Sequence, residues 1–348
     1  MDAGLFSDIK FNCDVSDAKF WGFYSVCGLL MRYRDLFRSE KGLKPWADIR
    51  REDIGAWIEQ KESRWPGLEQ KDLRDLVIDG QAFPPFDVSG INRALDGRGL
   101  VYGAGYGMYL KPTFFLAELR SVRRISGLTV YTSGRELVRD LFTSPGMLQE
   151  KSVFLRLEPL IVLLLYKHSE LNTRQVSALE DAFAHYGLPR RQIIDGTFEL
   201  RIAEMAERYS EILLAHELAE DAEEVADWKE ALSVAAGDRQ VEHYLRAVKD
   251  LVADTSDRGP LRMIIESRDC GALGLAIALA EGYRKILYPE LKAAYADFSL
   301  HHDWAAVERA RKTGYGLFLS RRDEIVKLFR DGKGNEVFMG EVKKLLSA

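Results

Sequence analysis

Cysteine is scarce in this chain, which argues against a fold held together by disulfides or by cysteine-bound zinc. Three cysteines occur among 348 residues, at Cys13, Cys27 and Cys270. No Cys-x-x-Cys pair is present, so neither a disulfide framework nor a cysteine-ligated zinc site is indicated. We expect free thiols in a reducing compartment.

Long hydrophobic runs are also missing. The longest apolar run extends from Leu160 to Tyr166, whereas a membrane-spanning helix needs about 20 such residues. The N-terminus shows no basic segment followed by an apolar core, so no signal peptide is expected. These absences predict a cytoplasmic protein without a membrane partner.

The chain has no excess of positive charge. It carries 49 lysines and arginines against 54 acidic residues, a net charge of −5. This balance argues against a dedicated nucleic-acid binder, and binding to an anionic membrane would need a local basic patch. A protein partner or a second copy of the chain stays open. Hydrophobic residues make up 47% of the sequence, ordinary globular usage, and the length predicts two domains.

The residue patterns predict an α+β fold that is mostly helical. Residues 1–75 have helical periodicity, and from Arg135 the pattern is helical almost to the end. Between them, glycines alternate with valine and tyrosine over residues 97–107, which predicts strands with tight turns. Residues 113–125 and 128–132 then predict an antiparallel hairpin around a two-residue turn.

These patterns divide the chain into two predicted domains. Residues 1–134 would form a helical arm with a small antiparallel β-sheet, and residues 135–348 an α-helical bundle. The sequence contains no flexible linker, so the boundary stays open and the two parts could share one core.

Three segments of the sequence carry a resemblance. The stretches "FSDIKFNCDVSDAKFWG", "GLLMRYRDLFRSEKGLKPW" and "GLVYGAGYGMYLKPTFFLAE" resemble an uncharacterised bacterial protein family that has no assigned activity. The resemblance extends over most of the chain. It implies no fold, substrate or catalytic residue.

A helix predicted over residues 199–228 carries the sharpest candidate site. His216 falls on its apolar face, and Glu220 lies one turn further on. The string His-Glu-Leu-Ala-Glu is similar to the HExxH zinc helix with its second histidine replaced by glutamate. His216 and Glu220 would then bind a divalent metal ion, and Glu217 would serve as a general base.

This metal site needs a third ligand from another helix. His243 is the first candidate, followed by Asp297 and His301. The competing interpretation is structural, because the same helix is rich in glutamate. A solvated acidic face with one satisfied histidine at its edge explains the whole pattern, and the structural interpretation is preferred.

The predicted hairpin offers a second candidate site. Arg120, Arg123 and Arg124 lie close together on its first strand. Arginine binds carboxylates and phosphates with two parallel hydrogen bonds, so an anion or nucleotide site is a reasonable hypothesis. The alternative is a charged, exposed sheet face, since edge strands carry charge that prevents aggregation.

Nucleophilic catalysis has no support, because the sequence contains no G-x-S-x-G elbow. The leading interpretation is therefore a scaffold or binding module. A metal-dependent enzyme using the HExxE helix is the first alternative, and an anion or nucleotide binder using the arginine hairpin is the second.

Overall fold

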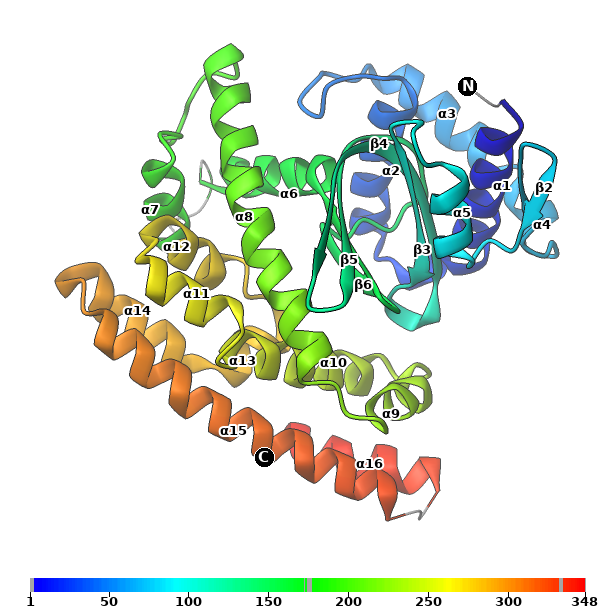
Figure 1. The fold of residues 1–348 in the computed structure, drawn as a ribbon. Coiled ribbons are helices and arrows are strands. Elements are labelled where there is room, and N and C mark those ends of the chain that lie inside the picture. Colours follow the sequence, from blue (N-terminus) through cyan, green and yellow to red (C-terminus); the bar gives the residue numbers. More distant parts are fainter. Residues whose placement is uncertain (1–2, 172, 174–176, 332–333, 348) are drawn as a thin grey trace. The chain divides into compact units, whose positions relative to one another are not determined.

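The protein consists of two compact units, Met1–Leu165 and Tyr166–Ala348, each of which is described by itself. The computed structural model describes residues 3–171, 173, 177–331 and 334–347 (Figure 1). In the first unit the elements are α1 (Ala3–Phe20), η1 (Trp21–Phe23), α2 (Val26–Glu40), α3 (Arg51–Glu62), α4 (Trp65–Leu68), β1 (Leu76–Ile78), β2 (Gln81–Phe83), α5 (Val88–Ala94), β3 (Leu100–Tyr106), η2 (Met108–Leu110), β4 (Pro112–Ile125), β5 (Leu128–Arg139), β6 (Gly146–Gln149), β7 (Ser152–Arg156) and the start of α6 (Leu157–Glu170).

The remaining elements are all helices. They are α7 (Ser177–His185), α8 (Gly196–Ala222), α9 (Trp228–Ala235), α10 (Arg239–Thr255), α11 (Pro260–Ser267), α12 (Cys270–Ala278), α13 (Gly282–Leu287), α14 (Pro289–His301), α15 (Trp304–Arg330) and α16 (Asn335–Ser347). The predicted helical character of the C-terminal half is therefore confirmed. No helix among the described residues has both the length and the apolar character needed to cross a membrane.

The predicted hairpin is confirmed as β4 and β5. Ile125 pairs with Leu128 across the turn, and both turn residues, Ser126 and Gly127, have positive φ values of 51° and 83°. Two consecutive residues with positive φ form a type I′ turn, which matches the twist of the flanking strands.

The larger sheet is mixed, which corrects the prediction of a wholly antiparallel sheet. Its strand order is β3-β4-β5-β7-β6, and β5 pairs with β7 in parallel, from Thr129 opposite Ser152 to Ser133 opposite Arg156. The chain leaves β5, forms the edge strand β6 and turns back, so β7 lies between them. A separate two-stranded antiparallel sheet consists of β1 and β2.

The prediction of helix from Arg135 onward is wrong for residues 135–156. β5 continues to Arg139, and β6 and β7 follow. All five residues of β7 are buried, so the strand shows no polar–apolar alternation. A short apolar run of this kind cannot be distinguished by periodicity from the buried helix that follows it. The two compact units accordingly divide after Leu165 instead of near residue 135.

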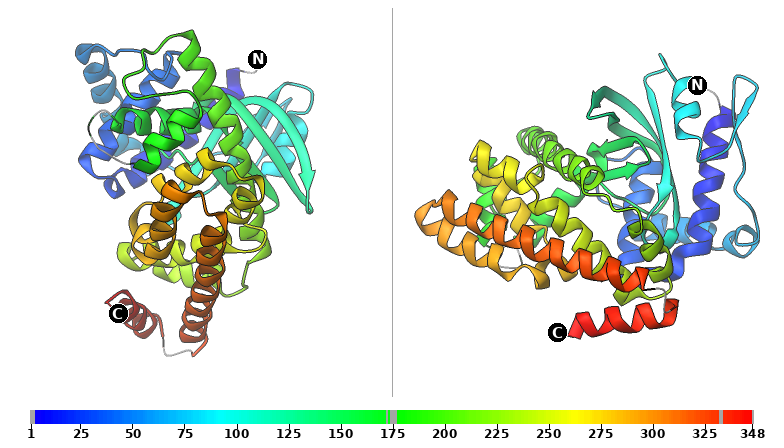
Figure 2. Two further views of the ribbon diagram at one scale, coloured as in Figure 1. Left: turned by 90° about the vertical axis from the view of Figure 1, so that its left-hand side faces the viewer. Right: turned by 60° about the horizontal axis from the view of Figure 1, so that its bottom comes forward.

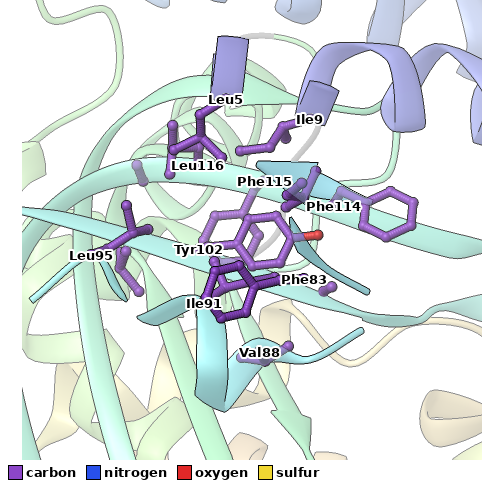
Figure 3. Close-up of a cluster of buried hydrophobic side chains, with 14 of the residues drawn as sticks. Leu5, Ile9, Phe83, Val88, Ile91, Leu95, Tyr102, Phe114, Phe115 and Leu116 are labelled. Atoms are coloured by element: carbon purple, nitrogen blue, oxygen red, sulfur yellow. The ribbon is translucent and has the colours of Figure 1, made fainter. Parts of the chain in front are cut away.

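The core of the first unit lies where β3 and the beginning of β4 pair. The register places Tyr102 opposite Leu116 and Gly103 opposite Phe115. Consecutive residues point to opposite faces of a sheet, so both faces are covered here. Figure 3 shows Leu5 and Ile9 of α1 together with Leu116 and Tyr102, in a cluster of buried side chains that includes Phe83, Val88, Ile91, Leu95, Phe114 and Phe115.

The glycines of β3 were predicted to mark tight turns, but Gly103 and Gly105 lie inside one strand. A Cβ atom at Gly103 would lie 2.2 Å from the ring of Phe115, closer than atoms can approach. A Cβ at Gly105 would meet the side chain of Gln149 at 2.1 Å. Glycine is therefore needed here because side chains from β4 and β6 cross the backbone of β3.

This close approach gives a direct stability prediction. Gly103→Ala should lower the free energy of unfolding by about 1–3 kcal/mol, because the added methyl group overpacks the core against Phe115. Gly55→Ala is the matched control, since Gly55 lies in α3 with no atom within 4 Å of the added Cβ. The control should be neutral or slightly stabilising in urea unfolding. Equal effects of the two substitutions would contradict this packing.

Buried charges also hold the first unit together. Lys111 Nζ lies 3.2 Å from Asp17 Oδ1 and 3.3 Å from Asp140 Oδ1. Asp17 accepts hydrogen bonds from the backbone of Leu141, and Asp140 from that of Phe114, so this cluster ties α1 to the sheet. Burial raises the pKa of Asp17 to about 6, although Lys111 opposes this shift.

The helices of the second unit begin at well-formed caps. Asp195 accepts a hydrogen bond from Phe198 N at the start of α8, and Asp238 accepts from Gln240 N and Val241 N at the start of α10. Figure 2 shows α8 in green and α15 in orange as the long helices of this unit, each of 27 residues. α8 ends at Ala222, earlier than the predicted helix, because the chain turns before α9 begins at Trp228.

Candidate functional site

The predicted metal helix contributes to a cluster of charged side chains between α8 and α10. His216 lies on α8 with Glu220 one turn further on, and its Nε2 is 3.3 Å from Glu220 Oε1. The other ring nitrogen, Nδ1, is 2.7 Å from Asp254 Oδ1 on α10. The imidazole is therefore held between two carboxylates, one from each helix.

Two cations complete the cluster. Lys249 Nζ of α10 donates to Glu220 Oε2 at 2.6 Å. Arg284 Nη1 of α13 lies 3.7 Å from Asp254 Oδ2 and 3.9 Å from Asp250 Oδ2. Each carboxylate of the cluster consequently has a cationic neighbour.

Three of these residues could together hold a metal ion. One ligand atom each from His216, Glu220 and Asp250 lies within 4.8 Å of the other two. One imidazole nitrogen with two carboxylate oxygens is a donor set that suits zinc, manganese, iron or cobalt. The three side chains are largely buried, with 16% of His216 and 12% of Glu220 exposed.

Asp254 has the geometry of a residue that orients a ligand. Metal-binding histidines almost always donate their second ring N–H to a carboxylate or a carbonyl, which fixes the tautomer of the ring. With Asp254 on Nδ1, the remaining nitrogen, Nε2, faces Glu220. This arrangement leaves Nε2 as the ligand atom.

The cluster strongly perturbs the protonation of its members. Burial by itself lowers the pKa of His216, but Asp254 and Glu220 outweigh it, so this pKa is well above 6.5. Burial likewise raises the pKa of Glu220, but His216 and Lys249 outweigh it, so this pKa is lowered. Burial raises the pKa of Asp250 despite Arg284 nearby. Without a metal, His216 is an imidazolium that bridges two carboxylates.

Glu217 was predicted as a general base. Its side chain is buried, and its pKa is raised to about 8 by burial and by the charge of Glu220. The carboxyl group is thus mainly protonated at neutral pH, in a form that cannot accept a proton. Its role as a base remains a hypothesis that this protonation state does not favour.

The raised pKa makes a prediction about stability and pH. The folded state binds the Glu217 proton more tightly than the unfolded state, where the pKa is near 4.5. The resulting stability is present below pH 4.5 and is lost as the pH rises through about 8, with a slope of at most about 1.4 kcal/mol per pH unit. Glu217→Gln should flatten the profile between these limits, as measured by urea unfolding over that range. An unchanged slope in the variant would show that Glu217 titrates normally.

The other predicted ligands lie elsewhere. His243 is on α10, but the group of converging ligand atoms contains Asp250 instead. Burial and Arg239 lower the pKa of His243. His301 forms an exposed pair with Asp297 on α14, with 2.9 Å between Nδ1 and Oδ1.

The three arginines of the hairpin lie on β4 and differ in exposure. Arg120 and Arg124 are exposed, and Arg123 is half-buried. Arg120 lies at an irregularity of the β4–β5 register, where its side chain crosses the backbone of Gly134. The anion hypothesis requires a cleft at this face, and exposed side chains give it no support.

Four members of the cluster were missed in the sequence: Lys249, Asp250, Asp254 and Arg284. Asp250 and Asp254 are four residues apart and therefore share a helix face, as His216 and Glu220 do. That repeated spacing could have pointed to Asp250 and Asp254 in the sequence. The sequence does not show that α8 and α10 are adjacent, because their adjacency is a tertiary contact.

A curled mixed sheet with helices, followed by an all-helical unit, defines a two-domain α+β protein. The chain belongs to a family of unknown function, DUF6866: the model of its N-terminal domain matches residues 4–156, and that of its C-terminal domain matches residues 162–347. The sheet thus lies wholly in the N-terminal domain, and the cluster around His216 in the C-terminal domain. Neither the curated proteins nor the solved structures include a match to this chain.

Proposed function

We propose that the C-terminal domain is a binding module for a divalent transition-metal ion, with His216, Glu220 and Asp250 as ligands. The convergence of these ligand atoms within 4.8 Å, from two helices, carries the proposal. The contact between Asp254 and His216 Nδ1 supports it, because it leaves Nε2 directed at Glu220.

A metal ion that binds here must displace the proton of His216 and the ammonium group of Lys249. A metal ion needs the neutral imidazole, so it must remove the proton that Asp254 and Glu220 stabilise on His216. It must also compete with Lys249, whose ammonium group contacts Glu220. The affinity should therefore rise with pH until the imidazole is neutral. A hard ion without affinity for nitrogen, such as Mg²⁺, should bind less well than Zn²⁺, Mn²⁺ or Co²⁺.

The rival interpretation is a structural ion-pair network. His216, Lys249 and Arg284 can neutralise Glu220, Asp250 and Asp254 without any ion, and such networks join helices. The two interpretations differ in one observable. A network gains nothing from added metal, whereas a binding site gains stability in proportion to the logarithm of the free ion concentration.

Thermal unfolding of protein prepared without a histidine tag tests the proposal. After removal of metal with a chelator, addition of Zn²⁺, Mn²⁺ or Co²⁺ should raise the Tm, and the chelator should reverse the increase. At a free concentration of 100 times the Kd, the stabilisation is about 2.7 kcal/mol. Asp250→Asn should reduce the shift, since it removes one ligand while nearly conserving shape. A Tm that is independent of all three ions would favour the ion-pair network.

A further inference from the structure

Exposed large apolar side chains are concentrated in one segment of the N-terminal domain. Five of them lie within eleven residues of sequence, and we call this group, together with Leu110, the apolar patch. Its members are Trp21, Phe23, Val26, Leu30, Met31 and Leu110.

Two separate chain segments build the patch. η1 leads directly into α2, where Val26 and Leu30 are one helical turn apart and therefore lie on the same face. Phe23 stacks on Tyr109 with 4.5 Å between the ring centroids, which brings the loop containing Leu110 beside it. Tyr109 and Leu110 both have positive φ, at 59° and 54°. Consecutive positive φ values are strained for side-chain-bearing residues and cluster at functional surfaces.

Exposed basic side chains lie beside the patch. From Lys19 to Arg34 the sequence contains three basic residues and no acidic residue. Lys19 and Arg34 are exposed at the two ends of this segment. Arg64 is also exposed and directly precedes Trp65, on which Trp21 stacks. A second copy of the chain would therefore present like charges to this surface, whereas an anionic surface would be attracted.

We propose that the apolar patch docks the N-terminal domain onto an anionic lipid surface. Tryptophan, tyrosine and phenylalanine favour the boundary between headgroups and acyl chains, where Val26 and Leu30 would also be removed from water. Lys19, Arg34 and Arg64 would contact lipid phosphates. Salt should weaken this attraction, because dissolved ions screen charges that are more than about one Debye length apart. The chain as a whole has a net negative charge, whereas the segment from Lys19 to Arg34 is basic.

Vesicle flotation and tryptophan emission test the proposal with the full chain. Vesicles of phosphatidylcholine mixed with phosphatidylserine should bind the protein, shift its emission to shorter wavelength and release it at high salt. Vesicles of phosphatidylcholine alone should bind it less. The double variant Val26→Asp with Leu30→Asp should lose binding roughly tenfold or more, because two buried aliphatic side chains are replaced by charges. Arg34→Glu should weaken binding only to the anionic vesicles.

The control is Val122→Asp, since Val122 is 50% exposed on β4 and lies outside the patch. Circular dichroism should show that all variants remain folded, because Val26 is 77% and Leu30 47% exposed. No binding to anionic vesicles, or equal loss in Val122→Asp, would overturn the proposal. So would light scattering that shows a dimer which the patch substitutions dissociate, because the patch would then be a self-association surface.

Discussion

His216→Ala is expected to lower the affinity of the protein for Zn²⁺ by about a hundredfold or more. Substitution of residues that merely orient a ligand costs 10–100-fold, and His216 is the only nitrogen donor in the group of converging ligand atoms. The variant also leaves Asp254 and Glu220 without their shared imidazolium, although Arg284 and Lys249 still contact them. Isothermal titration of tag-free protein measures the change.

His301→Ala is the matched control for this substitution. His301 and Asp297 have the same four-residue spacing and a similar distance between imidazole and carboxylate. The pair is exposed, however, and no third ligand converges on it among the residues that the structure describes. The control should keep the wild-type affinity. A loss of similar size in both variants would mean that zinc binds surface histidines adventitiously. Asp250→Asn provides a second test if His216→Ala unfolds.

Glu136→Ala is expected to destabilise the N-terminal domain by about 3–5 kcal/mol. The carboxylate of Glu136 is buried, with Oε1 2.6 Å from Arg156 Nε and Oε2 3.3 Å from Arg139 Nε. The guanidinium group of Arg156 also lies 4.2 Å from the centre of the Phe115 ring. Removing the carboxylate leaves two buried cations without their counter-ion.

Urea unfolding of Glu136→Ala measures this loss, and Asp53→Ala serves as the control. Asp53 pairs with Arg50 at 2.8 Å, but both side chains are exposed, so the control should leave stability almost unchanged. If Glu136→Ala were equally neutral, the buried pair would be dispensable for the fold. Addition of an Arg156→Met substitution should recover part of the loss, because it removes one of the uncompensated charges.

The sequence predicted those parts of the fold that depend on local pattern. The hairpin at Ser126 and Gly127 follows from a two-residue turn between strand-forming residues. β7 was missed because all of its residues are buried, which removes the alternation that marks a strand. Its parallel pairing with β5 could not be predicted, since it depends on which strands become neighbours after the chain turns back.

For the candidate site, too, the sequence indicated only those neighbours that lie on one helix. His216 and Glu220 lie on one helix, so their proximity follows from helical geometry. Asp250 takes the place where His243 was expected, although both are on α10. They are seven residues apart and hence on a similar face, so only the position of α8 along α10 decides between them. That position is set by the packing of the whole unit.

The most direct test of the metal-binding proposal is the stoichiometry of Zn²⁺ binding to tag-free, chelator-treated protein, measured by isothermal titration. A site at His216, Glu220 and Asp250 predicts one ion per chain, an affinity that increases with pH as the imidazolium loses its proton, and the loss of that ion in His216→Ala. Binding of no ion, or of one ion that His216→Ala retains, would contradict the proposal and leave the cluster as an ion-pair network that joins α8 and α10.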